Sequence, residues 1–345
     1  MSIISSPEGH AVQEITLDTK AVLELRAKDV RKERTGLHAH VIIFIHSKIV
    51  SHSTFNIYRE EDRTRLCNAA HSLFNDLDKA AYSKEQFRHD FGIFALALEE
   101  WLDNQWQAQL LEPTKPTGPV FILNPYILKE AGTILFSPPG KGKSWMALAM
   151  AVSIDAGVSD LWEVNKAPTL FVNLERSGLS FQRRLWQVNT ALGLDPQRKM
   201  LFINARGHTL AELGNSIRES VLRHSIQVVF IDSISRAGMG SLVDDRTANS
   251  IVDTLNQLGV AWYAIGHTPR ADATHIYGAV HFEAGEDIGI RMISQESPGS
   301  LGIGLEVVKA NDIAKPKKAY YRLTFDNAGL SGIETAKETD FPDLM

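Results

Sequence analysis

Cysteine is nearly absent from this sequence, since Cys67 is the only one among 345 residues. A lone cysteine cannot form an intrachain disulfide, and it excludes zinc sites that use four cysteines. Long apolar runs are missing too, because none approaches the ~18 residues of a membrane helix. The first residues have neither a cationic start nor a long apolar core, so no secretory signal is expected. These absences predict a protein of the reducing cytoplasm that does not enter a membrane.

The chain also lacks a strong excess of either charge. Lys and Arg total 36 against 41 Asp and Glu, which gives a formal net charge of −5 at pH 7. This balance does not indicate nucleic-acid binding, although a local basic patch can still bind a nucleic acid. With 44% apolar and 22% charged residues, the composition is that of a globular protein. The length suits one large domain or two ordinary ones.

A domain boundary is predicted at "EPTKPTGP", residues 112–119. Three prolines and a glycine in so short a run break regular structure. We therefore expect an N-terminal domain over residues 1–112 and a linker over 113–123. A larger domain should follow over residues 124–335, with a C-terminal tail over 336–345.

The N-terminal domain is predicted to be α+β. Short runs rich in β-branched and apolar residues indicate strands, and apolar residues at helical spacing then indicate two helices. The expected strands are 21–30, 38–50 and 52–58, and the expected helices are 59–77 and 83–106. The charged segment at 25–36 is interpreted as a solvated loop rather than a nucleic-acid patch. No catalytic group of residues is recognised here, so docking or oligomerisation is the expected role, with replication or recombination proteins as the expected partners.

The larger domain alternates strand and helix patterns. Continuous apolar strands separated by amphipathic helices predict an α/β fold with a mostly parallel sheet covered on both faces. The expected strands are 132–137, 168–175, 200–205, 227–234 and 261–268. The expected helices are 143–157, 179–193, 210–225 and 246–259. Two further strand-like runs, 300–310 and 319–327, have no helix between them and predict an antiparallel hairpin that extends the sheet.

A phosphate-binding loop is the most specific signal in the sequence. The run "SPPGKGKS" ends a strand pattern and begins a helix pattern, as the motif requires. Lys143 is expected to reach the β- and γ-phosphates of ATP, and Ser144 to bind Mg²⁺. The strict pattern has Gly where Ser137 stands, but that position only has to start a tight turn. The candidate nucleotide-binding residues are Ser137, Pro138, Pro139, Gly140, Lys141, Gly142, Lys143, Ser144 and Trp145.

Three polar residues follow other strands of the expected sheet. Asp232 ends an apolar run and is the candidate second group at the magnesium site, together with Ser144. Glu175 ends an earlier run and is the candidate general base for the attacking water. His267 ends a third run, where it could sense the γ-phosphate, because open α/β sheets bind ligands at this edge.

The order of these motifs resembles the RecA-like ATPases. Within them it is most similar to the branch of ring-forming replicative helicases of the RepA and DnaB types. The resemblance spans about residues 124–330 and rests on "SPPGKGKS", "FVNLE", "FIDSISR", "IGHTPR" and "LEVVKAND". It implies a RecA-like P-loop core, ATP and Mg²⁺ as cofactors, and catalytic roles for Lys143, Glu175 and His267.

The same resemblance implies a cation supplied from a neighbouring subunit. Lys309 matches the first position of the Lys-x-Arg pair that touches the neighbour's γ-phosphate in this family. The third position is Asn311 instead of Arg. Arg270 is therefore the first candidate for the missing cation, and Arg322 is the second.

The resemblance further implies a homo-oligomer, usually a hexamer, around single-stranded DNA. The loops near residues 236–249 and 270–287 would face the central channel, although a plain role as flexible connections is left open. The expected function is thus an ATP-hydrolysing replicative helicase or translocase. A recombination or repair ATPase and an ATP-dependent helicase loader are the alternatives.

Overall fold

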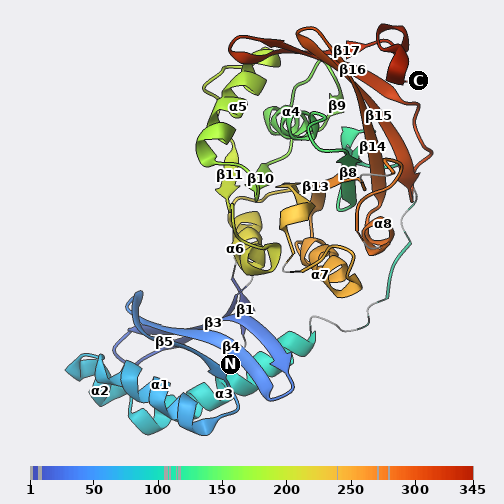
Figure 1. Ribbon diagram of the computed structural model, residues 1–345. Helices are drawn as coiled ribbons and strands as arrows, with labels where there is room; N and C mark the ends of the chain where they lie inside the picture. The colour runs from blue at the N-terminus through green and yellow to red at the C-terminus, as the bar shows by residue number, and fades with distance from the viewer. Residues whose placement is uncertain are drawn as a thin grey trace. The chain divides into compact units, whose positions relative to one another are not determined.

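The structure is a computed structural model that describes residues 3–6, 10–104, 108, 110–113, 115, 118–238, 240–269, 272–278 and 280–344. The chain divides into two compact units, Met1–Thr114 and Lys115–Met345 (Figure 1). Each unit has its own hydrophobic core. The division falls inside the proline-rich segment at which the sequence analysis places the domain boundary.

The smaller unit is an antiparallel sheet with helices packed on one face. Neighbouring strands along the chain pair with each other, so the sheet order follows the sequence, from β1 to β5. In the described part of this unit, the strands are β1 (Ile4–Ser5), β2 (Ala11–Thr16), β3 (Val22–Glu33), β4 (Gly36–Ile45) and β5 (Lys48–Asn56). The helices are α1 (Glu60–Ser72), α2 (Asp76–Ala81) and α3 (Lys84–Asn104). β1, β2 and α2 were not expected from the sequence.

The prediction of a solvated loop at residues 25–36 is wrong, because β3 runs through most of it. Leu23, Leu25 and Ala27 are fully buried and alternate with the charged side chains of the same strand. Alternation of this kind places the charges on the opposite face of the sheet. The strand expected at residues 21–30 therefore continues through the charged segment to Glu33.

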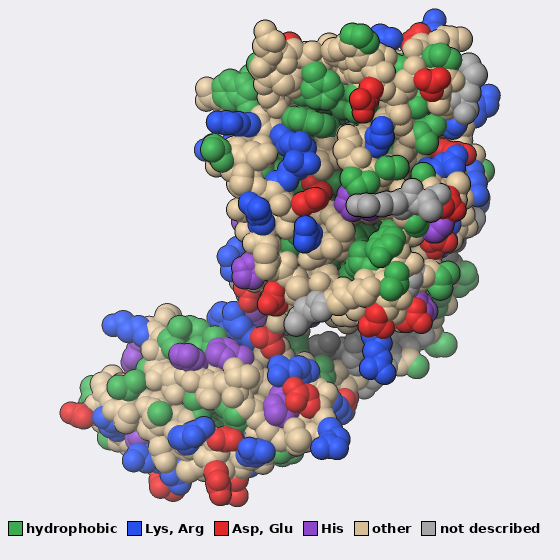
Figure 2. Space-filling view, viewed as in Figure 1, with side chains coloured by type: hydrophobic (Ala, Val, Ile, Leu, Met, Phe, Trp, Pro, Cys, Tyr) green, Lys and Arg blue, Asp and Glu red, His purple; other side chains and the backbone are tan. Residues whose placement is uncertain are grey.

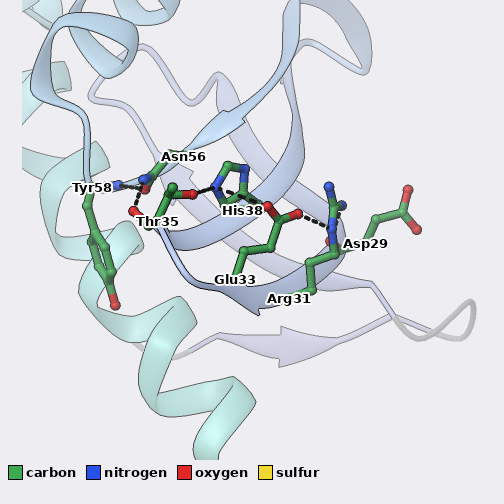
Figure 3. Close-up of polar contacts among 7 residues, drawn as sticks. All are labelled: Asp29, Arg31, Glu33, Thr35, His38, Asn56 and Tyr58. Carbon is green, nitrogen blue, oxygen red and sulfur yellow. Dashed lines mark hydrogen bonds and ion pairs between the residues drawn. The ribbon is translucent and has the colours of Figure 1, made fainter.

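The tip of the β3–β4 hairpin is tied by polar contacts (Figure 3). Arg31 Nε donates to Glu33 Oε1 at 2.8 Å, and Thr35 Oγ1 lies 2.8 Å from His38 Nε2. The Asn56 side chain bridges two segments, because its Nδ2 donates to the Thr35 carbonyl while its Oδ1 accepts from the backbone N–H of residue 58. The polar residues therefore support the hairpin.

The single strand expected at residues 38–50 is also wrong, because it is broken by a turn between β4 and β5. His46 and Ser47 have φ of 48° and 61°, which is the left-handed region that a two-residue hairpin turn uses. Gly and Asn are the residues that normally signal such a turn. Neither is present at residues 46–47, so the turn could not be predicted from the residue types.

The larger unit has a sheet of nine strands in the order β11-β10-β12-β13-β8-β14-β15-β16-β17, counted over described residues. Pairing is parallel from β11 to β14 and antiparallel from β14 to β17. The strands of this sheet are β8 (Gly132–Ser137), β10 (Thr169–Asn173), β11 (Leu201–Asn204), β12 (Val228–Asp232), β13 (Ala261–His267), β14 (Ile288–Ser297), β15 (Ser300–Ala310), β16 (Ala319–Asp326) and β17 (Gly329–Ala336). A small sheet holds β6 (Phe121–Asn124), β7 (Ile127–Leu128) and β9 (Glu163–Val164).

Helices cover both faces of the large sheet, as the sequence predicted (Figure 1). One core contains α4 and α5, and the other contains α6, α7 and α8. The strands supply alternate side chains to the two cores, so Leu135 of β8 faces one core while Ile134 and Phe136 face the other. The helices are α4 (Lys143–Ala156), α5 (Gly178–Ala191), α6 (Leu210–Arg223), α7 (Asp245–Asn256) and α8 (His281–Gly285).

The C-terminal part is larger than the expected hairpin. The predicted strands correspond to β15 and β16, and the structure adds β14 and β17 on either side. The residues expected as a tail pack onto the sheet, where Phe341 is 2% exposed and Leu344 is 1% exposed. Gly302 makes room for the Phe341 ring, because a Cβ at that position would lie 2.3 Å from it.

No helix in the described parts of the chain has the length and apolar character to span a bilayer.

The packing predicts that Gly132→Ala destabilises the larger unit. A Cβ at Gly132 would lie 2.1 Å from the ring of Trp262, which is 1% exposed and cannot move aside freely. We expect the free energy of unfolding to fall by about 1–3 kcal/mol. Urea denaturation followed by tryptophan fluorescence measures this change.

Gly214→Ala is the matched control. Gly214 lies inside α6, and a Cβ there would make an ordinary 3.4 Å contact with the side chain of Thr254. Alanine is favoured over glycine in a helix, so this variant should be at least as stable as the wild type. An unchanged midpoint for Gly132→Ala would contradict the packing argument.

Candidate nucleotide site

A cavity of about 530 Å³ lies at the carboxyl ends of the parallel strands β8, β10, β12 and β13. This is the edge at which open α/β sheets bind ligands. Its wall combines the phosphate loop, polar residues that follow the strands, and the turn between β14 and β15. The lining residues are Pro139, Gly140, Lys141, Gly142, Lys143, Ser144, Trp145, Glu175, Arg176, Arg184, Asp232, Ile265, His267, Glu296, Ser297, Gly299, Ser300, Leu301 and Phe325.

The phosphate loop joins β8 to α4 through two glycines in the left-handed region. Gly140 has φ of 80° and Gly142 has φ of 96°, conformations that other residues rarely adopt. Gly142 is also the N-cap of α4, so the positive end of the helix dipole faces the cavity. The loop therefore presents backbone N–H groups and a helix N-terminus to an anion.

Lys143 is the buried cation of the loop, with 5% of its surface exposed. Its Nζ donates to the carbonyls of Ser137 at 2.7 Å and Pro138 at 2.8 Å, and to Ser137 Oγ at 3.2 Å. Burial lowers the pKa of Lys143 to about 8, although Asp232 and Glu175 act in the opposite direction. A phosphate would add a negative partner in direct contact with this ammonium, whose hydrogen bonds in the structure go to neutral oxygens.

Ser137 and Pro138 do not line the cavity. Ser137 is fully buried, and the carbonyl oxygens of both residues accept hydrogen bonds from Lys143 Nζ. A serine at the position of the missing glycine thus adds a hydroxyl acceptor for the lysine.

Asp232 and Ser144 both line the cavity and are joined by a hydrogen bond, and this pair of oxygen ligands fits a magnesium site. Asp232 is 3% exposed, and burial raises the pKa of its carboxyl while a hydrogen bond from Ser144 lowers it. Its Oδ1 has no hydrogen-bond partner among the described residues, as expected for an oxygen that awaits a ligand. No cluster of three or more His, Cys, Asp or Glu forms a metal site in those residues. Mg²⁺ would therefore take most of its ligands from phosphates and water, as it commonly does.

Glu175 stands directly after β10 and lines the cavity. Its Oε2 accepts from Ser233 Oγ at 3.4 Å, and Ser233 Oγ lies 2.6 Å from Ser235 Oγ. The turn that carries Glu175 is shaped by the buried Asn173, whose Oδ1 accepts from the Arg176 backbone N–H at 2.9 Å. Sequence reasoning missed Asn173, because an amide at the end of a strand gives no specific signal.

His267 ends β13 beside the phosphate loop, since it pairs with Ser137 across the two strands. Burial and the nearby Lys143 ammonium lower the pKa of His267, so a neutral imidazole is favoured. Its Nδ1 is buried without a partner in the described structure and is available for a polar ligand.

Two arginines of the cavity were not predicted. Arg184 of α5 lies with its guanidinium 4.2 Å from the ring centre of Trp145, which fixes its position. Burial lowers its pKa to about 10, so it stays charged at neutral pH. Arg184 Nη1 and Arg176 Nε are buried without partners in the described structure. Arg183 and Arg184 are adjacent in an amphipathic helix, and the sequence alone could not show which one faces the cavity.

Lys309 and Asn311 lie outside the cavity of their own chain. Lys309 Nζ donates to the backbone carbonyls of Glu283 and Glu286, and Asn311 Nδ2 donates to Asp287 Oδ1 at 3.2 Å. Both side chains hold the segment that joins α8 to β14. Their role toward a neighbouring subunit stays a prediction.

Arg322 and Arg270 were considered as substitutes for the arginine expected at position 311, and Arg322 does not line the cavity. Arg322 pairs with Glu334 at 2.8 Å and lies over the Phe341 ring. Arg270 lies outside the residues that the structure describes.

Figure 2 shows that Lys and Arg side chains gather on the face of the larger unit over α5, β10 and β11.

The low pKa of Lys143 predicts that nucleotide affinity falls at alkaline pH. Phosphate binding requires the ammonium form, which the free protein loses as pH rises through about 8. We expect the affinity for a nonhydrolysable ATP analogue to drop by about tenfold between pH 7 and pH 9. Titration calorimetry at a series of pH values measures this.

Lys143→Arg is the informative comparison, because a guanidinium remains charged over this range. The variant should bind more weakly at pH 7 but show a flat pH profile. An equal alkaline decline in both proteins would assign the titration to another group.

Comparison with known proteins agrees with this geometry. A family model described as an AAA domain matches residues 99–273, just over half of the chain. No curated protein matches the chain. Among solved structures, a KaiC-like protein, PH0186 from the hyperthermophilic archaeon Pyrococcus horikoshii OT3, is 17% identical, with a TM-score of 0.46 over 64% of this chain and 100% of that one. The family match covers the phosphate loop, Glu175, Asp232 and His267, and the chain belongs to the AAA domain family.

Proposed function

We propose that this chain hydrolyses ATP with Mg²⁺ and uses the reaction to drive a ring-forming motor on single-stranded DNA, as a replicative helicase or translocase of the RepA and DnaB type. The observation that carries hydrolysis is the meeting of Lys143, Glu175 and Asp232 in one cavity of nucleotide size. A protein that only bound nucleotide would not need Glu175 as well as Asp232.

The chain's own residues divide the chemistry among them. Lys143 and the loop N–H groups bind the phosphates, and Ser144 and Asp232 would hold Mg²⁺, which neutralises phosphate charge when bound. Glu175 accepts a proton from the attacking water. It follows the carboxyl end of β10, and its side chain is accessible from the cavity. Arg184 and Arg176 place two positive charges where the transferred phosphoryl group develops charge.

The proposed action on DNA rests on the loops that leave the same edge of the sheet. The segment after β12 contains Arg236 and two glycines, Gly238 and Gly240, and the segment after β13 contains His275 and the 43% exposed Tyr277. Cations and an exposed aromatic ring on glycine-containing loops suit the backbone and bases of a single strand.

A second candidate is an ATPase that regulates assembly, such as a helicase loader. Lys309 is engaged with backbone carbonyls of its own chain, and Asn311 replaces the expected arginine. A site whose cations come from the same subunit, Arg176 and Arg184, can work without a ring.

Glu175→Gln should abolish hydrolysis while ATP still binds. Loss of a general base typically costs 10²–10⁴-fold in rate, so we expect kcat to fall by about a thousandfold with little change in affinity. Phosphate release and equilibrium binding of ATP measure the two effects. Glu130→Gln is the matched control, because Glu130 is an exposed residue that pairs only with Lys129 in the described structure. A variant at Glu175 with wild-type turnover would remove it from the proposed mechanism.

The motor itself is tested by strand displacement. On forked DNA with ATP, the wild type should separate strands of one polarity, and Lys143→Ala should not. Mass measurement with a nonhydrolysable analogue should show a ring, because closed symmetry gives every nucleotide a neighbour. Hydrolysis that DNA stimulates, without unwinding of either fork and without a ring, would favour the loader over the helicase.

A further inference from the structure

The residues after β17 form a C-terminal segment, residues 338–344, that packs on the antiparallel strands (Figure 1). It consists of two short 3₁₀ helices, Glu338–Asp340 and Pro342–Leu344, with Phe341 between them. The side chains of Phe341 and Leu344 are buried, whereas the other residues of the segment are exposed. Two apolar side chains therefore anchor the segment, which has no part in the chemistry proposed above.

Three strands supply one row of residues beneath the segment. Gln295 of β14, Gly302 of β15 and Arg322 of β16 stand side by side in the pairing register. The Phe341 ring fills the space over Gly302, where a Cβ would lie 2.3 Å from it, and the Arg322 guanidinium lies 5.3 Å from the ring centre. Gln295 Oε1 accepts from the Asp343 backbone N–H at 3.0 Å. The segment thus ties β14, β15 and β16 together.

The same stretch of β15 forms a wall of the nucleotide cavity with its opposite face. Consecutive residues of a strand point to opposite faces, so Leu301 points away from the segment that covers Gly302. Leu301 lines the cavity and lies against the phosphate loop, because a Cβ on Gly142 would come within 2.9 Å of its side chain. Glu296, at the other side of the β14–β15 turn, has its Oε1 3.6 Å from Lys141 Nζ of the loop. The segment and the cavity therefore lie on the two sides of one strand pair.

The part of β14 nearest this turn is weakly held by the sheet. Among the described strands, β8 pairs with β14 only over residues 288–291, so residues 292–297 have β15 as their single neighbour. A strand end with one neighbour opens at a lower free-energy cost than the centre of a sheet. The hydrogen bond from Asp343 to Gln295 restrains this end, and the Phe341 ring restrains β15 beside it.

We propose that the C-terminal segment holds the β14–β15 turn against the phosphate loop and thereby sets the affinity for the nucleotide. While Phe341 lies on Gly302, Leu301 stays against the loop and the turn closes one side of the cavity. When the ring leaves, the turn also adopts open positions, and the apparent affinity falls in proportion to the fraction of closed molecules. Phe341 is a positioning residue, because it acts on the nucleotide only through β15. The inference rests on the proposed nucleotide site and does not depend on DNA or on a ring.

Phe341→Ala should weaken the binding of a nonhydrolysable ATP analogue by about tenfold, as expected if about one molecule in ten keeps the turn closed. Titration calorimetry measures this affinity. Steady-state hydrolysis should show a matching rise in KM with an unchanged kcat, because the segment lies on the face of β15 opposite to the core that contains α4. Phe341→Leu keeps an apolar side chain over Gly302 and should recover most of the affinity.

Loss of a buried ring also lowers stability, so the matched control is the same loss elsewhere in the larger unit. Phe282→Ala removes a fully buried ring from α8 and should lower the unfolding midpoint while the affinity stays at the wild-type level.

Gly302→Ala separates affinity from stability. By itself it forces a Cβ into the Phe341 ring and should lower both the unfolding midpoint and the affinity. In the Phe341→Ala background the same methyl group enters an emptied space and should raise the midpoint, whereas the affinity should stay low. The effect of one substitution on stability thus changes sign, as a double-mutant cycle between contacting residues allows.

The outcomes separate this inference from the proposed function. An affinity that follows the unfolding midpoint through all of these variants would reduce the segment to a structural role. Wild-type affinity in Phe341→Ala would overturn the inference, whether or not the protein hydrolyses ATP. If the wild type binds the analogue but hydrolyses no ATP, and Phe341→Ala binds it more weakly, the proposed hydrolysis fails and the positioning role stands. A wild type that binds no analogue would refute both.

Discussion

The burial of the Lys143 ammonium is the constraint on which the rest of the site depends. A charged group with so little exposed surface is costly unless its donors are satisfied and a negative partner is near. The backbone carbonyls of Ser137 and Pro138 satisfy the donors, and this requires the loop to fold back over the lysine. The left-handed glycines make that fold possible, and the parallel sheet brings Asp232 and Glu175 within electrostatic reach.

The cavity is defined as much by unused polar groups as by those already paired. Asp232 Oδ1, Arg184 Nη1 and His267 Nδ1 are buried without partners in the described residues, although buried polar atoms are normally hydrogen-bonded. They differ in sign and lie around one cavity, which is what a ligand with both phosphate and metal charge requires. The stacking of Arg184 on Trp145 holds its charge in place before any ligand arrives.

Glu175 links two cavities that share a wall. It lines the nucleotide cavity and also a second cavity that contains Arg206 and Arg236, and the Ser233 hydroxyl, which follows β12, donates to it. A carboxylate in this position responds to charge on both sides.

The sequence by itself determined the order of the parallel strands β8, β10, β11, β12 and β13 and of the helices α4 to α7 between them, because the buried strands are continuous apolar runs and the helices follow their own period. It also placed Glu175, Asp232 and His267 at strand ends and Lys143 at the start of the helix after the phosphate loop, and parallel pairing brings these residues together. Only the tertiary structure decided which side chains complete the site. Arg184 reaches the cavity from α5, and which side of that helix faces the cavity depends on packing. The turn at residues 46–47 uses a left-handed conformation that His and Ser do not predict. The reason is physical: local patterns record burial and period, whereas the direction of a side chain depends on contacts between distant segments.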